Sequence, residues 1–244
     1  MPCRAVRAAS AADRHVGTEL FTRPGPTSGV SETEAETETA PALRVYADYV
    51  CPFCYLGYAS LSEYREERSE PLATDWHPFD IRASERRPDG TIDHSADSGK
   101  DEAYYEEAKR NVRRLAEEYG VEMAGELRKD VDSYDAQRVA LRASEEHPAA
   151  FEAFHGAVFE ALWQEGRDIG DPAVLADLAA GAGLPDGFVA ETLADDDDSA
   201  AELKTAFEDA REFGVTGVPT FVHDDYAARG AVPPEQLRRL VEGA

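Results

Sequence analysis

The sequence predicts a mixed α/β fold in which a small sheet-containing domain is interrupted by a long helical segment. Three observations support this prediction. A strand–helix–strand pattern begins at Leu43, a block of helical periodicity runs from about residue 101 to 213, and a strand–strand–helix pattern closes the chain. A chain of 244 residues can bury such a core without disulfide staples.

Residues 1–41 show no sustained periodicity. Acidic and small polar residues alternate over residues 31–39, which predicts a disordered, acidic N-terminal tail. A mis-assigned start codon could produce the same leader. The third cysteine of the chain, Cys3, lies in this tail.

The first predicted element is a strand at 43–49, which leads into a helix at 52–68. Pro52 fits the first turn of this helix, because the N–H that proline lacks would be unpaired there anyway. A second strand is expected at 73–79. Residues 84–100 are rich in Pro, Gly, Asp and Ser and predict a loop. Candidate buried positions on the helix are Leu56, Ala59, Leu61 and Tyr64.

The middle segment predicts six helices, because apolar residues recur in it with helical spacing. Three helices have credible N-terminal caps in Asp101, Ser133 and Asp171. The predicted ranges are 101–119, 133–147, 149–165, 171–182, 185–194 and 198–213.

After residue 213 the pattern changes. Residues 214–222 predict a tight loop that feeds a strand, and Asp224-Asp225 marks a turn. A partner strand is expected at 226–231 and a closing helix at 233–242.

The chain carries 25 basic residues against 50 acidic ones, for a formal charge of −25. Such a charge argues against nucleic acid and anionic membrane surfaces as partners. The acidic excess is typical of proteins from a high-salt cytoplasm, where screening removes the self-repulsion. We therefore expect a halophilic, haloarchaeal source, with an ordinary acidic mesophile protein as the alternative.

No run of the sequence approaches the roughly 18 apolar residues that span a bilayer. The N-terminus is basic but lacks the apolar segment of a secretory signal. We therefore expect a cytoplasmic protein without a membrane partner. In that compartment a lone Cys-x-x-Cys is more often catalytic, redox-sensing or metal-binding than a permanent bridge.

The Cys51-Pro52-Phe53-Cys54 segment follows the first predicted strand and opens the first predicted helix. Two thiols at this spacing can close a small disulfide and reopen it. The partial positive charge of a helix N-terminus favours a thiolate on the first cysteine. Position and spacing together predict dithiol–disulfide exchange.

Two other interpretations of the cysteine pair stay open. A zinc site needs four ligands, yet the chain has one cysteine pair, and His77 and His155 have no metal-like spacing. We expect no metal. Structural burial of both cysteines is also open, because free cysteine often packs as a small hydrophobe.

A second feature, Gly217-Val218-Pro219-Thr220-Phe221, follows the helical block. Proline is poorly tolerated inside a sheet ladder, so Pro219 should lie at a strand start or in a special peptide geometry. With this feature the chain resembles the thioredoxin superfamily. The matching segments are Tyr49–Gly57, Gly214–Val222 and Gly230-Ala231 before the last helix. The resemblance is closer to its DsbA-like branch, and within that branch to FrnE-type proteins.

This resemblance implies an α/β, thioredoxin-like fold interrupted by a large all-helical insertion. The thioredoxin-like domain would comprise residues 43–83 and 214–244, and the helical insertion residues 84–213. The resemblance also implies a cis Val218–Pro219 peptide beside the disulfide. The cis peptide would expose the Val218 backbone for pairing with a substrate strand.

The activity that the resemblance implies is that of a thiol–disulfide oxidoreductase without a cofactor beyond the cysteine pair. Cys51 would exchange with the substrate, and Cys54 would resolve the mixed disulfide. Phe53 offers no charge to a thiolate, whereas DsbA has histidine there, so we expect a less oxidising couple. The expected catalytic residues are Cys51, Cys54 and Pro219, and the expected substrate contacts are Phe53, Val218 and Pro52.

Aromatic residues near the cysteines could contact substrate or could simply pack in the hydrophobic core. We expect Tyr49 and Phe221 to belong mostly to the core, and Phe53 to be the best candidate for substrate contact. A packed or surface position is also expected for His77 and His155.

The expected partner is a thiol- or disulfide-containing protein or a small thiol. One alternative is a glutathione-dependent isomerase or transferase of the 2-hydroxychromene-2-carboxylate isomerase or kappa type. Those enzymes typically carry serine where Cys51 stands, so the presence of both Cys51 and Cys54 counts against this role. A non-enzymatic holdase chaperone is the third class. The sequence does not predict the oligomeric state.

Overall fold

The computed structural model describes residues 42–87, 90–93, 95–96, 99–124, 130–194 and 198–243. The predicted tail at 1–41, with Cys3, lies outside the described residues. No helix in the described ranges is long and apolar enough to cross a membrane.

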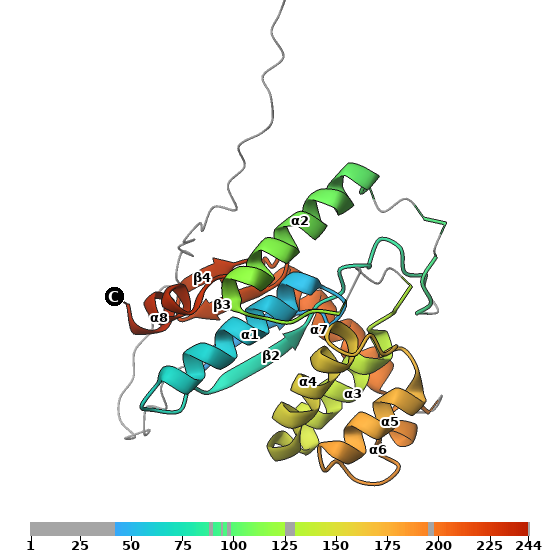
Figure 1. Ribbon diagram of the computed structural model, residues 1–244. Coiled ribbons are helices and arrows are strands. Elements are labelled where there is room, and N and C mark those ends of the chain that lie inside the picture. The colour runs from blue at the N-terminus through green and yellow to red at the C-terminus, as the bar shows by residue number, and fades with distance from the viewer. Residues whose placement is uncertain are drawn as a thin grey trace, which may run out of the picture.

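A four-stranded sheet forms the centre of the structure, in the order β2-β1-β3-β4. Strand β1 (Leu43–Ala47) pairs in parallel with β2 (Thr74–Pro78) and antiparallel with β3 (Thr220–His223), which pairs antiparallel with β4 (Tyr226–Arg229). Strands from the two ends of the described chain are therefore neighbours in the middle of the sheet (Figure 1). This pairing brings the Cys-x-x-Cys segment close to the loop before β3.

Eight helices are present in the described ranges. Helix α2 lies along α1, α8 packs on α1 and β4, and α7 contacts β2 and α3 (Figure 1). Helices α3 to α6 form a group beside the sheet. The helices are α1 (Pro52–Glu67), α2 (Glu102–Tyr119), α3 (Tyr134–Glu146), α4 (Pro148–Trp163), α5 (Pro172–Gly181), α6 (Phe188–Thr192), α7 (Ser199–Glu212) and α8 (Pro234–Glu242).

The two faces of the sheet bury different side chains, because successive residues of a strand point to opposite sides. Leu43 and Phe221 pack with α1 and α8 on one face. Tyr46 and Val222 pack on the other face with Ala210 of α7. Each face therefore has its own helical cover, as an α/β fold requires. The predicted fold class is confirmed.

A third and larger hydrophobic cluster joins the end of β1 and the start of α1 to the helical segment. Tyr49 and Cys54 belong to the same cluster as Val139 of α3 and Phe159 of α4. The helical segment thus shares one continuous core with the cysteine-bearing part of the chain.

The predicted helix at 185–194 is wrong in its bounds, since α6 comprises only residues 188–192. Gly187 has a φ of 84°, a left-handed conformation that favours glycine, and the helix begins after it. The Phe188 N–H bonds the Pro185 carbonyl, 3.1 Å away, which makes residues 185–188 a turn.

Two smaller predictions also differ from the structure. Asp101 and Asp171 cap α2 and α5 with their side chains, but Ser133 makes no such bond to α3. Its hydroxyl instead donates to Asp48, 2.5 Å away, because a buried carboxylate is the stronger acceptor. Ala59 is only half-buried, whereas Ser60 is buried and bonds the Val232 carbonyl.

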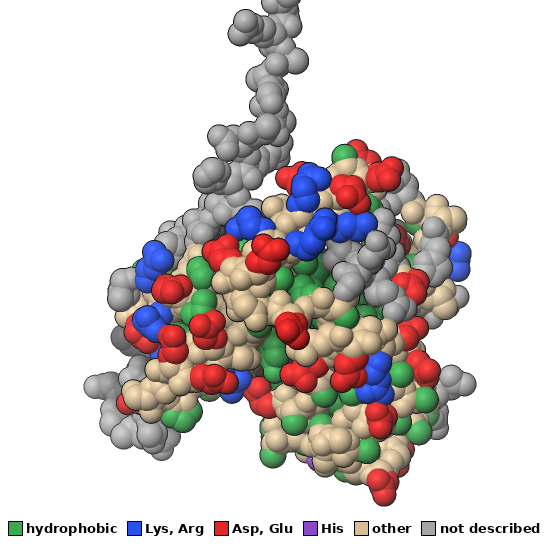
Figure 2. Space-filling view, viewed as in Figure 1, with side chains coloured by type: hydrophobic (Ala, Val, Ile, Leu, Met, Phe, Trp, Pro, Cys, Tyr) green, Lys and Arg blue, Asp and Glu red, His purple; other side chains and the backbone are tan. Residues whose placement is uncertain are grey.

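Charged side chains cover the surface unevenly. Figure 2 shows carboxylates spread over the visible face, while basic side chains gather over α2. The basic residues of α2 are Lys109, Arg110, Arg113 and Arg114. Four basic residues therefore lie close together on α2, although this helix also carries acidic residues.

Candidate redox site

The two cysteines lie at the start of α1. Cys51 occupies the N-cap position with an extended backbone, and Pro52 follows in the first turn. The Cys51 N–H donates to the Asp48 carbonyl (3.1 Å), and the Cys54 N–H donates to the Cys51 carbonyl (3.0 Å). Both cysteines are free thiols, 6% and 2% exposed, so the structure represents the reduced pair.

The loop before β3 lies directly against Cys51. Its Val218–Pro219 peptide bond is cis, and the Cys51 thiol donates to the Val218 carbonyl, with 3.7 Å between sulfur and oxygen. Gly57 of α1 permits this approach, because a Cβ there would lie 3.1 Å from the rings of Pro219 and Phe221. Sequence-distant segments thus form one site.

Cys51 lines a cavity of about 670 Å³. We call it the Cys51 cavity. Phe53 and Pro52, both half-buried, lie in its wall with Val218, so the residues expected to contact substrate do line one cavity. Other walls come from residues 79–85, from the first turns of α2 and from Trp163.

Asp48 is a fully buried carboxyl group three residues before Cys51. It accepts hydrogen bonds from the backbone N–H groups of Val50 (3.2 Å) and Ile81 (3.0 Å), and from the side chains of Ser133 (2.5 Å) and Gln137 (3.3 Å). It therefore ties the cysteine turn to the loop after β2 and to α3.

Burial raises the pKa of Asp48 to about 6, because the charged form loses its hydration. The hydrogen bonds from Ser133 and Ile81 offset part of this effect, and the nearby charge of Asp80 adds to it. A carboxyl group with such a pKa can gain and lose a proton near neutral pH.

The pKa of the Cys54 thiol is raised well above its ordinary value, chiefly by burial. A hydrogen bond from its thiol to Cys51 and the charge of Asp48 act in the same direction. Cys54 must therefore give its proton to a neighbour before it can act as a nucleophile.

A small cavity of about 30 Å³ lies on the other side of Cys54, lined also by Trp76 and His155. His155 is buried among aromatic rings and hydrogen-bonds the Tyr49 hydroxyl (2.7 Å) through Nδ1. Burial lowers the pKa of His155 to about 4, so this imidazole is neutral at pH 7. It serves packing, as expected from the sequence, and Tyr49 and Phe221 are core residues, as predicted.

Sequence reasoning missed the polar partners of Asp48. Ser133, which directly precedes α3, and Gln137 of α3 lie 85 and 89 residues further along the chain. Asp48 itself carried a signal, as an acidic residue inside the apolar run before Cys51. In the described ranges, no group of three or more His, Cys, Asp or Glu side chains could hold a metal ion.

Comparisons with known proteins agree with this geometry. A family model described as a DSBA-like thioredoxin domain matches residues 42–242. The chain therefore belongs to the DSBA-like thioredoxin domain family.

Individual relatives point the same way. The chain is 30% identical over 218 residues to the uncharacterized protein YwbO of Bacillus subtilis (strain 168). This match covers 82% of the chain and 94% of YwbO. A crystal structure of a probable DsbA oxidoreductase from Streptomyces coelicolor is similar with a TM-score of 0.66 and 26% identity, covering 83% of this chain and 90% of that one.

A 2-hydroxychromene-2-carboxylate isomerase is also similar, with a TM-score of 0.63 and 19% identity over 83% of this chain and 93% of that one. At that identity the likeness shows a shared fold only. Membership of this family points to thiol–disulfide chemistry, and the particular reaction depends on the residues of the site.

Proposed function

We propose that this protein is a thiol–disulfide oxidoreductase that exchanges a Cys51–Cys54 disulfide with thiols or disulfides of a protein or a small molecule. One observation carries the proposal: two free thiols lie at a helix start, and the first of them lies against the Val218 carbonyl at the wall of a cavity large enough for a substrate. A pair used only for packing would not need this access.

From the reduced pair, the exchange begins with attack of the Cys51 thiolate on one sulfur of a substrate disulfide. The other substrate sulfur leaves as a thiolate, and a Cys51–substrate mixed disulfide forms. Cys54 then loses its proton and attacks the Cys51 sulfur, which releases the second substrate thiolate. Two electrons pass to the substrate, and the reverse steps oxidise a substrate dithiol.

Asp48 is the group best suited to accept the proton of Cys54. Its carboxyl group is buried and close enough to Cys54 for its charge to raise the thiol pKa. Gln137 can accommodate either state of Asp48. The Gln137 carboxamide oxygen is buried without a partner in the described ranges, and a 180° turn of the amide would offer it to a protonated Asp48.

The proposal is tested by counting thiols before and after mild reduction in a Cys3→Ser background, so that only the pair responds. Two thiols should appear when an oxidised sample is reduced. Cys51→Ser should abolish disulfide reductase and oxidase activity, while Cys54→Ser should accumulate the mixed disulfide with substrate. An unchanged thiol count, or full activity of Cys51→Ser, would refute the proposal.

The same variants separate the alternatives. A glutathione-dependent isomerase or transferase would act on an aromatic or electrophilic substrate and would keep its activity in Cys54→Ser. A holdase would suppress aggregation equally well in Cys51→Ser. We favour the oxidoreductase because both cysteines are free thiols at the start of α1 and the first of them bonds the Val218 carbonyl.

Several finer assignments accompany this proposal. We propose a FrnE-type protein of a halophilic cytoplasm, with residues 84–213 as a helical insertion that selects the substrate. Two lines support these assignments. The acidic composition supports the halophilic source, and the α2 residues in the wall of the Cys51 cavity support a role of the insertion in substrate choice.

A further inference from the structure

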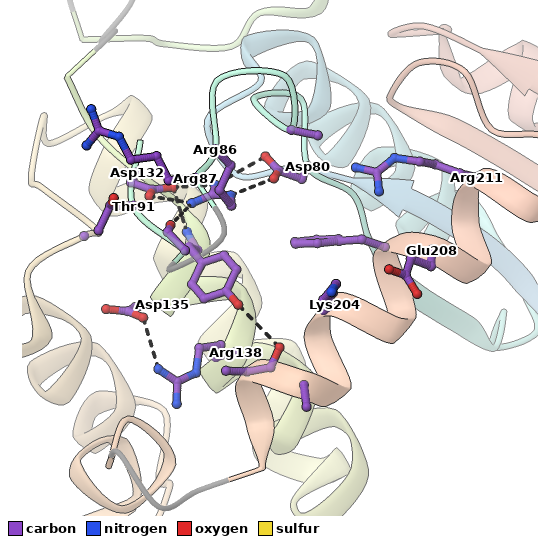
Figure 3. A pocket seen from close by; sticks show the side chains of 17 residues that line it. Asp80, Arg86, Arg87, Thr91, Asp132, Asp135, Arg138, Lys204, Glu208 and Arg211 are labelled. Atoms are coloured by element: carbon purple, nitrogen blue, oxygen red, sulfur yellow. Dashed lines mark hydrogen bonds and ion pairs between the residues drawn. The ribbon is translucent and has the colours of Figure 1, made fainter. Parts of the chain in front are cut away.

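A second and larger cavity lies between the loop after β2, the start of α3 and one side of α7 (Figure 3). Its volume is about 930 Å³. It contains neither cysteine and shares only Asp80 and Ala83 with the Cys51 cavity. We call it the α7 cavity, and the proposed redox chemistry makes no use of it.

The α7 cavity is lined by a larger proportion of basic residues than the chain has as a whole. Over the whole sequence basic residues number half as many as acidic ones, 25 against 50. In this cavity the basic side chains slightly exceed the acidic ones. The basic side chains are Arg86, Arg87, Arg138, Lys204 and Arg211, and the acidic ones are Asp80, Asp132, Asp135 and Glu208.

Some of these charges hold the cavity together. The Arg86 side chain is 10% exposed and donates to both Asp80 and Asp132, at distances of 2.7 to 3.3 Å. Its guanidinium also lies over the Tyr134 ring, 4.7 Å from the ring centre. Arg138 bonds Asp135, Ser199 and the Thr192 carbonyl. These contacts hold the side chains of Arg86 and Arg138 in place, and both guanidinium groups already have hydrogen-bond partners within the protein.

The cations on α7 are placed differently. Lys204 and Arg211 are seven residues apart, so both lie on one face of the helix. Figure 3 shows them on α7, across the cavity from Arg86 and Arg87. Both are exposed, and neither forms an ion pair with any carboxylate in the ranges that the structure describes. Arg87, which is half exposed, forms an ion pair with Asp93.

Two backbone features add positive potential at the same place. The first turns of α3 and α7 contribute Tyr134, Ala200 and Ala201 to the lining. A helix N-terminus carries a partial positive charge from its unpaired N–H groups. Asp135 and Glu208 oppose this potential, but Asp135 already pairs with Arg138.

We propose that the α7 cavity binds a small organic polyanion with at least two carboxylate or phosphate groups, held by Lys204 and Arg211. The volume admits a metabolite-sized ligand. Arginine forms paired hydrogen bonds to carboxylate and phosphate, and lysine adds a point charge. A ligand with two anionic groups can contact both Lys204 and Arg211, while the rest of the ligand fills the cavity between α7 and Arg86.

Isothermal titration calorimetry tests this site with two probes, citrate for carboxylates and pyrophosphate for phosphates. The titrations use the full chain at about 0.1 M chloride. At this concentration salt screens charges that lie more than about 10 Å apart, while direct contacts between the probe and a side chain are retained. At least one probe should bind saturably with one-to-one stoichiometry. The double substitution Lys204→Glu, Arg211→Glu should weaken that binding at least tenfold, because two charge-assisted contacts become repulsive.

The matched control is Arg110→Glu, Arg113→Glu, two exposed α2 residues whose replacement changes the net charge equally. This control should bind the probe like the parent chain. Equal weakening in both double variants would mean a general charge effect and would overturn the site, as would the absence of saturable binding for both probes. Circular dichroism confirms that both double variants are folded. Binding should persist in Cys51→Ser, which separates this test from the proposed redox function.

Discussion

Among single residues, Asp48 combines complete burial with a carboxyl group that ionises near neutral pH. Its folded pKa of about 6 exceeds the ordinary value of 3.8, so the folded protein holds this proton more tightly than the unfolded chain. The stabilising effect is full below about pH 4 and is lost as the pH rises through about 6. Ionisation of Asp48 thus costs about 3 kcal/mol above pH 7, an order-of-magnitude value.

We expect Asp48→Asn to remove this part of the pH dependence. The free energy of unfolding should fall between pH 4 and 7 in the parent chain by about 3 kcal/mol more than in the variant. Denaturant titrations at several pH values measure the difference. Asp186→Asn, at an exposed position, is the control and should keep the parental slope. A variant slope equal to the parental one would contradict the assignment.

Phe53 separates the two thiols and offers neither a charge nor a hydrogen bond to a thiolate. We expect Phe53→His to make the couple more oxidising, because a cationic imidazole near a helix start stabilises the thiolate of the reduced form. Equilibration against glutathione measures the shift, and about 30 mV corresponds to a tenfold change in the equilibrium constant. Phe53→Leu, which adds no charge, should shift the potential much less. A potential for Phe53→His at or below the parental value would contradict this account.

Among the secondary-structure elements, the contact between α1 and the start of β3 determines how closely the cysteine segment can approach the Val218–Pro219 loop. Gly57 of α1 faces Pro219 and Phe221, and an added Cβ would lie 3.1 Å from both rings. Phe221 is fully buried and the proline ring is stiff, so neither can withdraw easily. The close approach depends on glycine at this position.

Gly57→Ala should therefore destabilise the protein by about 1–3 kcal/mol, despite the better helix propensity of alanine. It should also slow disulfide exchange, because it presses on the peptide beside Cys51. Gly181→Ala, at the end of α5 with open space around the new methyl group, is the matched control. It should be neutral or stabilise by up to about 1 kcal/mol. Denaturant unfolding compares the two, and equal effects would contradict the steric argument.

For the whole molecule, a net charge of −25 implies repulsion that salt can screen. The screening length falls from about 10 Å at 0.1 M salt to about 3 Å at 1 M. We expect the melting temperature to rise by several degrees between 0.1 and 1 M KCl at pH 7. Near pH 4.5, the isoelectric point of the sequence, the rise should be much smaller. A flat profile at pH 7 would contradict a dominant role for repulsion.

The fold class was predictable because local patterns agree with the final structure. The strand before Cys51, the helix after it and the strand after Pro219 all appear close to their predicted places. The polar environment of Cys54 was not predictable. Asp48 meets Ser133 and Gln137 only after α3 packs against the end of β1, and no local pattern encodes that contact. The α7 cavity likewise combines cations from the loop after β2 with cations of α7, which only tertiary packing brings together.

The two tryptophans of the chain each line a cavity that one of the two cysteines also lines. Trp163 lines the Cys51 cavity and donates its indole N–H to the Tyr49 carbonyl (2.8 Å), while Trp76 shares the small cavity with Cys54. Indole emission responds to the polarity of its surroundings and to quenching by nearby sulfur. Closing or opening the disulfide should therefore change the fluorescence of the unlabelled protein. The aromatic core thus supplies an intrinsic optical reporter with which the potential of the pair can be followed directly.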